Sequence, residues 1–193
     1  VSGLVYHPFS LSMDRIRAMP QRTQITRHDC VEGWSCIGEW SGPQLALILA
    51  AASPKANARY AMFYCADPMT AEGDPTHMYY ESLELSEAVH PQTILAHRLN
   101  GKTLDVAHGA PVRLRAERQL GYKQPKYLQR IVPVDSLDGI GGRKGGYCED
   151  QRYTWYGGIP QQACNRSRTL PNSFSIFIGR SLCANPSPRF CCV

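Results

Sequence analysis

Residues 108–134 read HGAPVRLRAERQLGYKQPKYLQRIVPV, and this stretch contains two strand signals in close succession. Across residues 112–118 apolar and charged residues alternate, which is typical of a β-strand that buries one face. The alternation places Arg113 and Arg115 on the same face of that strand. Residues 127–134 predict a second strand, so we expect two strands joined by a basic loop.

Outward from this stretch, the chain predicts further short strands and few helices. The expected strands cover residues 23–28, 59–65 and 78–83. The expected helices cover residues 11–19, with Ser12 as the N-cap, and residues 44–52. A turn is expected at residues 41–43, with Pro43 suited to the first helical position. Because strands and helices do not alternate regularly, the sequence predicts a mixed, β-rich α+β fold and not a doubly wound sheet.

The positive charge of the chain is concentrated in one segment. The formal net charge is +5, and residues 113–130 contain six Arg and Lys residues against Glu117 alone. Such a density of cationic donors suits an anionic ligand such as a phosphate ester. A solvated strand face would give the same alternation, so both interpretations stay open. Basic and aromatic residues are not interleaved as in known nucleic-acid-binding modules, which disfavours that class.

The sequence changes character after Ile159. Residues 160–193 contain four Pro, five Ser and four Cys, have no acidic residue and show no hydrophobic period. We expect one domain over residues 1–159 and a disordered or unrelated tail over residues 160–193. The longest apolar run, residues 45–52, is too short to cross a bilayer, so no transmembrane segment is expected.

The beginning of the chain has neither a Met nor a basic-then-apolar leader. Residues 1–4 have the character of the middle of a strand. We therefore expect the domain to be incomplete at its N-terminus, with the signal region absent from this chain.

A second informative stretch is RTQITRHDCVEGWSCIGEWSG, residues 22–42. Cys30 follows an expected strand and has Arg27 and His28 beside it, where a thiolate is favoured. A thiolate is a suitable ligand for a transition metal, but a lone Cys is also a common small core residue. A zinc site formed by His28, Cys30 and Cys36 is disfavoured, since no second Cys/His pair follows at a suitable spacing. The scattered cysteines of residues 1–159 do not suggest a disulfide framework.

Three stretches together resemble the bacterial molybdopterin-binding oxidoreductases of the sulfite oxidase family. They are residues 22–42, residues 79–131, which begin YYESL, and residues 145–159, GGYCEDQRYTWYGGI. The resemblance covers residues 2–159. It implies a mixed α+β domain around one molybdenum ion, which the dithiolene of a pyranopterin and one cysteine hold. The match places that catalytic, metal-binding cysteine at Cys30.

The resemblance also implies roles for residues around the cofactor. The residues implied to contact the pterin or its phosphate are Cys65, His108, Arg113, Gln124, Pro125 and Lys126. Tyr79 matches a tyrosine of the family's substrate pocket and is implied to be catalytic. Cys148 departs from the family pattern, because an aromatic residue is expected there. An Asn-containing segment that precedes the match in relatives is also missing.

The implied function is molybdenum-dependent oxygen-atom transfer on a sulfite-like or sulfoxide substrate. The chain contains no Cys-x-x-Cys-His haem motif, so electrons would be exchanged with a separate haem-containing partner. A protein-methionine-sulfoxide reductase subunit is the second candidate among enzymes. The alternative is a binding module that keeps the fold without an active metal. The expected location is the periplasm, with the cytoplasm as the alternative.

Overall fold

A computed structural model describes residues 1–70, 73–74 and 77–159 of the chain. The tail that the sequence predicts at residues 160–193 lies outside the described residues. Among the residues that are described, no helix is long and apolar enough to span a membrane.

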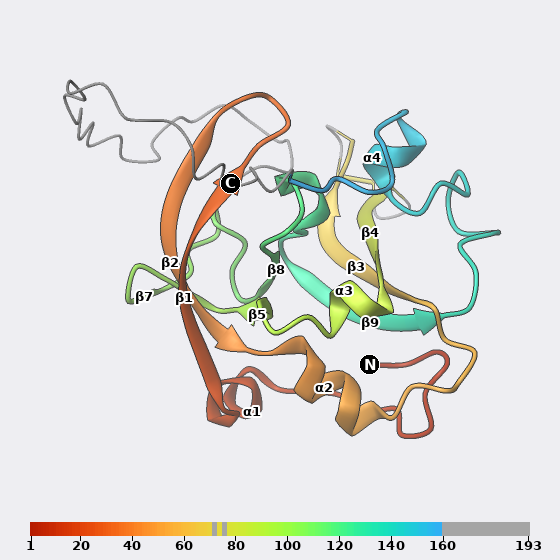
Figure 1. The fold of residues 1–193 in the computed structure, drawn as a ribbon, viewed down its shortest axis with the longest axis horizontal. Coiled ribbons are helices and arrows are strands. Elements are labelled where there is room, and N and C mark those ends of the chain that lie inside the picture. Colours follow the sequence, from red (N-terminus) through yellow and green to blue (C-terminus); the bar gives the residue numbers. More distant parts are fainter. Residues whose placement is uncertain (71–72, 75–76, 160–193) are drawn as a thin grey trace, which may run out of the picture.

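The described residues form three antiparallel sheets (Figure 1). The first sheet has the order β1-β2-β6-β7, with bounds Gln21–Asp29, Ser35–Pro43, Arg98–Leu99 and Lys102–Thr103. The second has the order β4-β3-β9, with bounds Met78–Glu84, Tyr60–Pro68 and Leu128–Val134. The third pairs β5, Thr93–Ala96, with β8, Arg113–Ala116. Figure 1 shows β5 and β8 between the long β1–β2 hairpin and the second sheet.

Only short helices accompany these sheets in the described part of the chain. They are α1 (Met13–Ala18), α2 (Leu45–Ala52), α3 (Leu85–Ala88), η1 (Gly121–Lys123) and α4 (Tyr147–Asp150). The predicted N-cap of α1 is confirmed, because the backbone N–H of Arg15 donates to Ser12 Oγ. The predicted strands near residues 23–28, 59–65, 78–83 and 127–134 are also confirmed.

The turn predicted at residues 41–43 is wrong, because β2 continues through Pro43. This end of β2 packs closely on β5, and a Cβ atom on Gly42 would collide with the backbone of Leu95. Glycine is therefore required here for the approach of two backbones, not for a turn. Helix α2 begins at Leu45, two residues after Pro43, and Gln44 takes the N-cap position.

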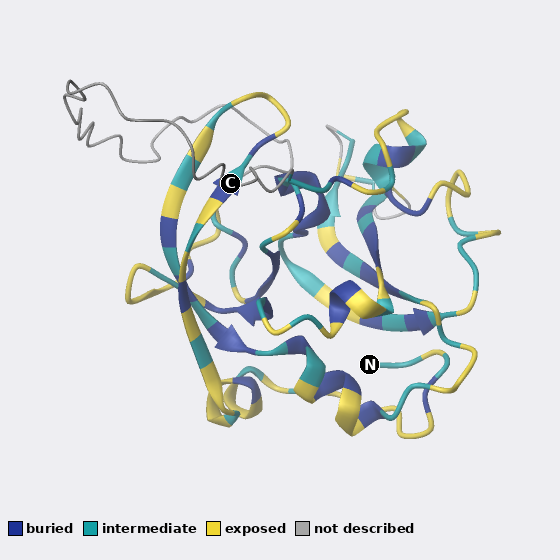
Figure 2. Ribbon diagram, in the orientation of Figure 1, coloured by how far each residue is buried: buried dark blue, intermediate teal, exposed yellow. Residues whose placement is uncertain are grey.

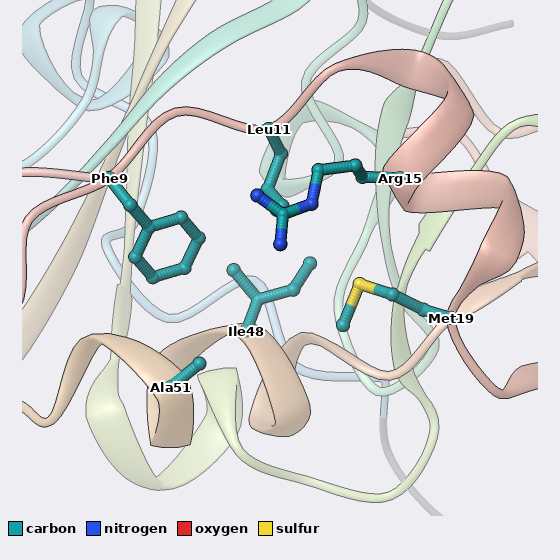
Figure 3. A pocket seen from close by; sticks show the side chains of 6 residues that line it. All are labelled: Phe9, Leu11, Arg15, Met19, Ile48 and Ala51. Atoms are coloured by element: carbon teal, nitrogen blue, oxygen red, sulfur yellow. The ribbon is translucent and has the colours of Figure 1, made fainter.

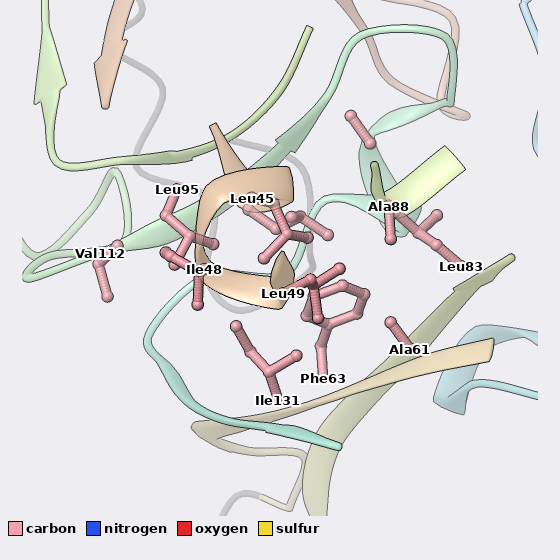
Figure 4. Close-up of a cluster of buried hydrophobic side chains, with 12 residues drawn as sticks. Leu45, Ile48, Leu49, Ala61, Phe63, Leu83, Ala88, Leu95, Val112 and Ile131 are labelled. Atoms are coloured by element: carbon pink, nitrogen blue, oxygen red, sulfur yellow. The ribbon is translucent and has the colours of Figure 1, made fainter. Parts of the chain in front are cut away.

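The main core lies between α2 and the sheets. Leu45, Ile48 and Leu49 of α2 point toward Phe63 of β3 and Ile131 of β9 (Figure 4). Each of these side chains is buried, and removing a side chain of this size from a core costs about 2–5 kcal/mol. The core therefore fixes β3 and β9, and β9 directly follows the basic loop that residues 117–127 form after β8.

Of the two interpretations of residues 112–118, the solvated strand face is wrong. All four residues of β8 are buried, including Arg113 and Arg115 (Figure 2). Periodicity distinguishes the two faces of a strand, but it does not report whether other elements cover both. In contrast, β1 alternates between exposed and buried residues, as a strand with one solvated face should.

A buried ion-pair cluster connects β4, η1 and α4. Lys123 of η1 donates to Glu81 of β4 and to Glu149 of α4, with both N–O distances at 2.5 Å. All three side chains are at most 1% exposed. Burial raises the pKa of Glu81 well above its usual value, and the nearby Glu149 raises it further against the opposing effect of Lys123. Lys123 therefore binds two carboxylates of the protein itself. The expectation that the basic segment faces a phosphate is wrong for this residue.

We predict that Lys123→Met destabilises the protein much more than Glu81→Gln. Met removes the ammonium group and leaves two carboxylates buried without it, which should cost about 3–5 kcal/mol of unfolding free energy. Gln imitates a protonated Glu81, so its loss should stay near 1 kcal/mol. Denaturant unfolding measures both values. Equal small losses would show that the charges of this cluster do not hold β4, η1 and α4 together.

Candidate functional site

Two buried guanidinium groups stacked on one indole ring form the centre of the candidate site. The guanidinium carbons of Arg113 and Arg115 lie 5.1 and 4.3 Å from the centroid of the Trp40 ring. Both arginines belong to β8, whereas Trp40 belongs to β2. A planar, weakly hydrated guanidinium is the cation best suited to such stacking. The stacking joins the third sheet to the first.

Arg115 is held by an acid and a histidine. Its Nε and Nη2 donate to the two carboxylate oxygens of Glu117, at 3.1 and 2.6 Å. Its Nη1 lies 2.6 Å from His28 Nδ1. Because arginine only donates hydrogen bonds, Nδ1 is the acceptor and the ring proton of His28 is on Nε2. Burial, followed by the charges of Arg115 and Arg113, lowers the pKa of His28 to about 3, so this tautomer is neutral.

Arg113 brings together the residues that the resemblance implied for the cofactor. Its Nη1 donates to the carbonyl of His108 at 3.2 Å, and its Nη2 donates to the carbonyl of Gln124 at 3.1 Å. The neighbouring Leu114 N–H donates to the carbonyl of Pro125. Segments 16 residues apart in the sequence therefore meet along β8.

Lys126 completes this group through a close approach of two loops. Gly109 has a φ of +98°, and a Cβ atom there would lie 2.9 Å from the Lys126 side chain. Only glycine combines this backbone conformation with this space. Lys126 Nζ donates to the carbonyl of Ala107 at 3.3 Å and is half-buried. His108 lies on the outer side and interacts with Asp105 through Nδ1 at 2.6 Å.

Several buried polar atoms in this group make no hydrogen bond within the described part of the chain. Among them are His28 Nε2, Trp40 Nε1 and Gln124 Oε1, and these side chains are at most 3% exposed. The side chain of Gln124 acts on His28 and raises its pKa, although burial and the charges of Arg115 and Arg113 lower that pKa more strongly. Buried polar atoms without partners are costly, and they commonly mark a place for a ligand or ordered water.

Cys30 lies in the connection between β1 and β2, two residues after His28. It is 4% exposed, its N–H donates to the carbonyl of Trp34, and the N–H of Glu32 points to its sulfur at 3.4 Å. Cys36 is the cross-strand neighbour of His28 and is only half-buried, so it does not belong to the core. No disulfide links two cysteines of the described residues.

Cys65 belongs to β3 and Tyr79 to β4, the two neighbouring strands of the second sheet. Cys65 pairs with Leu128 of β9, and burial raises the pKa of its thiol, as do Asp67 and Glu81. Tyr79 is 1% exposed, and its hydroxyl donates to the carbonyl of Tyr122 in η1 at 2.5 Å. Tyr79 therefore supports the backbone just before Gln124. The hydrogen bonds described here connect neither residue directly with Cys30.

A cavity of about 950 Å³ is lined by one residue that was implied for the cofactor, Cys65, together with Tyr64 and Arg130. A cavity of about 360 Å³ between α1 and α2 is lined by Phe9, Leu11, Arg15, Met19, Ile48 and Ala51 (Figure 3). None of these residues was implied for the cofactor. In the part of the chain that the structure describes, no three His, Cys, Asp or Glu side chains form a group that could hold a metal ion by themselves.

Sequence reasoning missed the role of His28 and Arg115 as a pair. The signal was present in the period of two residues along each strand. His28 precedes Cys30 by two positions, and Arg115 follows Arg113 by two positions. What the sequence lacked was the packing of β8 on the β1–β2 hairpin, which brings these residues together across 87 positions.

Comparison with curated proteins gives relatives that are named as protein-methionine-sulfoxide reductase subunits. The chain is 42% identical over 158 residues to a provisionally named protein-methionine-sulfoxide reductase subunit of Azospira oryzae, covering 82% of this chain and 54% of the relative. It is 36% identical over 143 residues to the catalytic subunit of a protein-methionine-sulfoxide reductase of Xanthomonas campestris pv. campestris, covering 71% and 44%. The chain therefore spans about half the length of these relatives.

Comparison with solved structures agrees with the expected fold. The sulfane dehydrogenase from Paracoccus pantotrophus matches with a TM-score of 0.61 at 21% identity, over 69% of this chain and 37% of that one. The predicted sulfite oxidase-type α+β fold is confirmed.

The family model described as oxidoreductase molybdopterin binding domain matches residues 1–137. This match also confirms, at the level of the family, the cofactor that the sequence implied. With more than half of the chain matched and a relative at 42% identity, the chain belongs to the family of oxidoreductase molybdopterin-binding domains.

Proposed function

We propose that this chain binds a molybdenum-bearing pyranopterin and reduces a sulfoxide, the substrate class named by its relatives, methionine sulfoxide in proteins. The observation that carries the proposal is the group of buried cations and partnerless polar atoms around His28 and Gln124, two residues from the Cys30 thiol. The cations that act on His28 are Arg113, Arg115 and Lys126.

The residues present fit this cofactor on two counts. First, the positive charges around His28 favour an anionic group such as the cofactor's phosphate. Second, His28 Nε2 and Gln124 Oε1 offer a donor beside an acceptor, and a pterin ring carries both kinds of group on its edge. Arg113, Gln124, Pro125 and Lys126 would hold the pterin and phosphate, while Cys30 would be the protein's metal ligand.

The metal, when bound, supplies the two-electron oxygen-atom transfer. The protein contributes binding, orientation and a dry environment. The N–H of Glu32, which points to the Cys30 sulfur, would favour a thiolate, whereas the Glu32 carboxylate, which accepts from the Cys30 thiol at 3.9 Å, favours the protonated form. The buried Trp40 ring keeps water from the two guanidinium groups, which strengthens their attraction for an anion.

Reduction of a sulfoxide consumes two electrons and two protons and releases water, so an electron donor is needed. We propose that a separate haem-containing partner supplies the electrons, because this chain contains no haem attachment motif. We propose the periplasm as the location of both. Oxidation of a sulfite-like substrate is the second candidate, since the fold matches a sulfane dehydrogenase. A fold that binds no active metal would be distinguished from both by the absence of molybdenum.

We also propose residues 1–159 as the cofactor-binding unit. The last described residues return to the segment that follows β8. Leu120 N–H donates to the carbonyl of Gly157, and Ile159 N–H donates to the carbonyl of Arg118. These bonds close the chain against the segment that leads into η1.

Lys126→Ala should weaken cofactor retention without lowering the melting temperature. A charge-assisted hydrogen bond to an anion contributes roughly 1.5–3 kcal/mol, so pterin should dissociate at least about tenfold faster. Pterin released on denaturation, measured against protein after gel filtration, reports retention. Arg130→Ala is the matched control, because Arg130 lies in the same basic segment but stacks on Tyr64. Equal retention in both variants would remove Lys126 from the site.

Cys30→Ser should abolish reduction of methionine sulfoxide in a peptide while pterin stays bound. A hydroxyl is a hard and poorly ionised ligand, so the metal's potential and its thiolate absorption should both change. Turnover is measured with a reduced viologen as the electron donor, and sulfite oxidation is measured in parallel. Cys36→Ser is the control, since Cys36 is half-buried on the neighbouring strand. Activity in Cys30→Ser and none in Cys36→Ser would contradict the ligand assignment. Faster sulfite oxidation by the unchanged protein would favour the second candidate.

A further inference from the structure

We infer that a cavity of about 950 Å³ on the second sheet binds the polypeptide around the methionine sulfoxide, with Arg130 against an acidic residue of that polypeptide. This inference rests on the proposed function and adds to it the way in which a protein substrate is held. Residues of β3, β4 and β9 line the cavity, together with residues 139–141 and residues of α4.

The first argument is the size of the cavity. Cavities that hold a whole drug-sized ligand measure about 300–1,000 Å³, and this cavity lies near the upper end of that range. One methionine sulfoxide side chain is only a fragment of such a ligand. The cavity therefore has room for several neighbouring side chains, which a polypeptide supplies and a free amino acid does not.

The second argument is that one end of the cavity adjoins the proposed cofactor site. Cys65, which lines the cavity, was implied to contact the cofactor. The N–H of the next residue, Ala66, donates to the carbonyl of Tyr127 at 2.9 Å, and Tyr127 directly follows Lys126 of the basic loop. A polypeptide in the cavity would therefore run toward the residues that are proposed to hold the pterin and its phosphate.

Helix α4 provides a second connection to the proposed site. Tyr147 of α4 lines the cavity, and its ring centroid lies 5.8 Å from that of Tyr79, the tyrosine implied for the substrate pocket. Figure 1 shows α4, η1 and the connection between β1 and β2 at the same end of the molecule. The Cys30 connection and the cavity thus belong to one end of the fold.

The third argument is the aromatic character of the walls. Tyr64 of β3, Tyr80 of β4 and Tyr147 of α4 all line the cavity. Gly141 lies against Tyr80, and a Cβ atom on this glycine would collide with the tyrosine hydroxyl. Rigid tyrosine rings provide a large contact area at a low cost in conformational entropy, and they are common in surfaces that recognise polypeptides.

The fourth argument is the charge that the cavity presents. Asp150 lines the cavity, but its carboxylate already accepts from the N–H groups of Gly142 and Lys144, at 2.7 and 3.2 Å. Arg130 is exposed, and its guanidinium carbon lies 4.2 Å from the centroid of the Tyr64 ring. Within the described residues Arg130 forms no ion pair. A cation on an aromatic ring without an acid beside it favours an acidic residue of the substrate.

Peptides that carry one methionine sulfoxide beside a Glu, a Gln or a Lys residue test the inference. The whole chain is purified from a host that makes the cofactor, and turnover with a reduced viologen is expressed per bound pterin. Arg130→Gln removes the charge and Arg130→Glu reverses it. Arg59→Glu is the matched control, because Arg59 is also exposed, precedes β3 and does not line the cavity. It changes the net charge as much as Arg130→Glu does.

We expect the unchanged protein to reduce the Glu peptide with a kcat/KM about tenfold above that for the Lys peptide, mainly through a lower KM. This ratio is equivalent to about 1.4 kcal/mol. Arg130→Gln should remove the preference and Arg130→Glu should reverse it, while Arg59→Glu keeps it. Turnover of the Gln peptide reports that each variant is folded and loaded.

An unchanged preference in both Arg130 variants would overturn the inference. Loss of the preference in Arg59→Glu would overturn it too, because the overall charge of the protein would then be the cause. Reduction of free methionine sulfoxide but of no peptide would also overturn it. An unchanged protein that reduces neither the peptides nor free methionine sulfoxide would instead contradict the proposed function.

Discussion

The stacking of Arg113 and Arg115 on one face of β8 against Trp40 is the constraint on which the rest of the site depends. Two fully buried guanidinium groups cannot be placed in a core without strong compensation. Glu117 compensates Arg115 directly, while Arg113 donates to the carbonyls of His108 and Gln124. To make these bonds, β8 must lie between the hairpin and the basic loop. The geometry of both segments follows from that requirement.

This arrangement explains why a fold of this size keeps so much charge inside. Lys123 is neutralised by two buried carboxylates and serves the packing of η1 on β4 and α4. The charges of Arg113, Arg115 and Lys126 act instead on His28, whose imidazole stays neutral. The basic segment thus divides into a part whose charge is compensated by carboxylates, namely Lys123 and Arg115, and a part that produces a positive potential at His28, namely Arg113 and Lys126. An anionic cofactor beside His28 would lower the free energy of the second part.

The sequence predicted the fold class, most strands and the α1 cap, because these depend on local patterns. It failed where the answer depended on packing. Alternation in residues 112–118 gave the correct shared face of Arg113 and Arg115, but it did not report that β2 covers this face. The partners of Lys123 lie 42 and 26 residues away, and nothing in the local sequence indicates them. The sequence indicated only that His28 lies near Cys30. It did not indicate that Arg115, 87 residues away, contacts His28 Nδ1 and so fixes the position of the ring proton.

The measurement that tests the central claim most directly is the molybdenum content of the purified protein. Elemental analysis, set against pterin content, counts the metal per chain. We expect about one molybdenum and one pterin for each chain, because one cysteine sulfur and a dithiolene together satisfy the metal. Zinc in its place, or protein without metal and without pterin, would contradict the account.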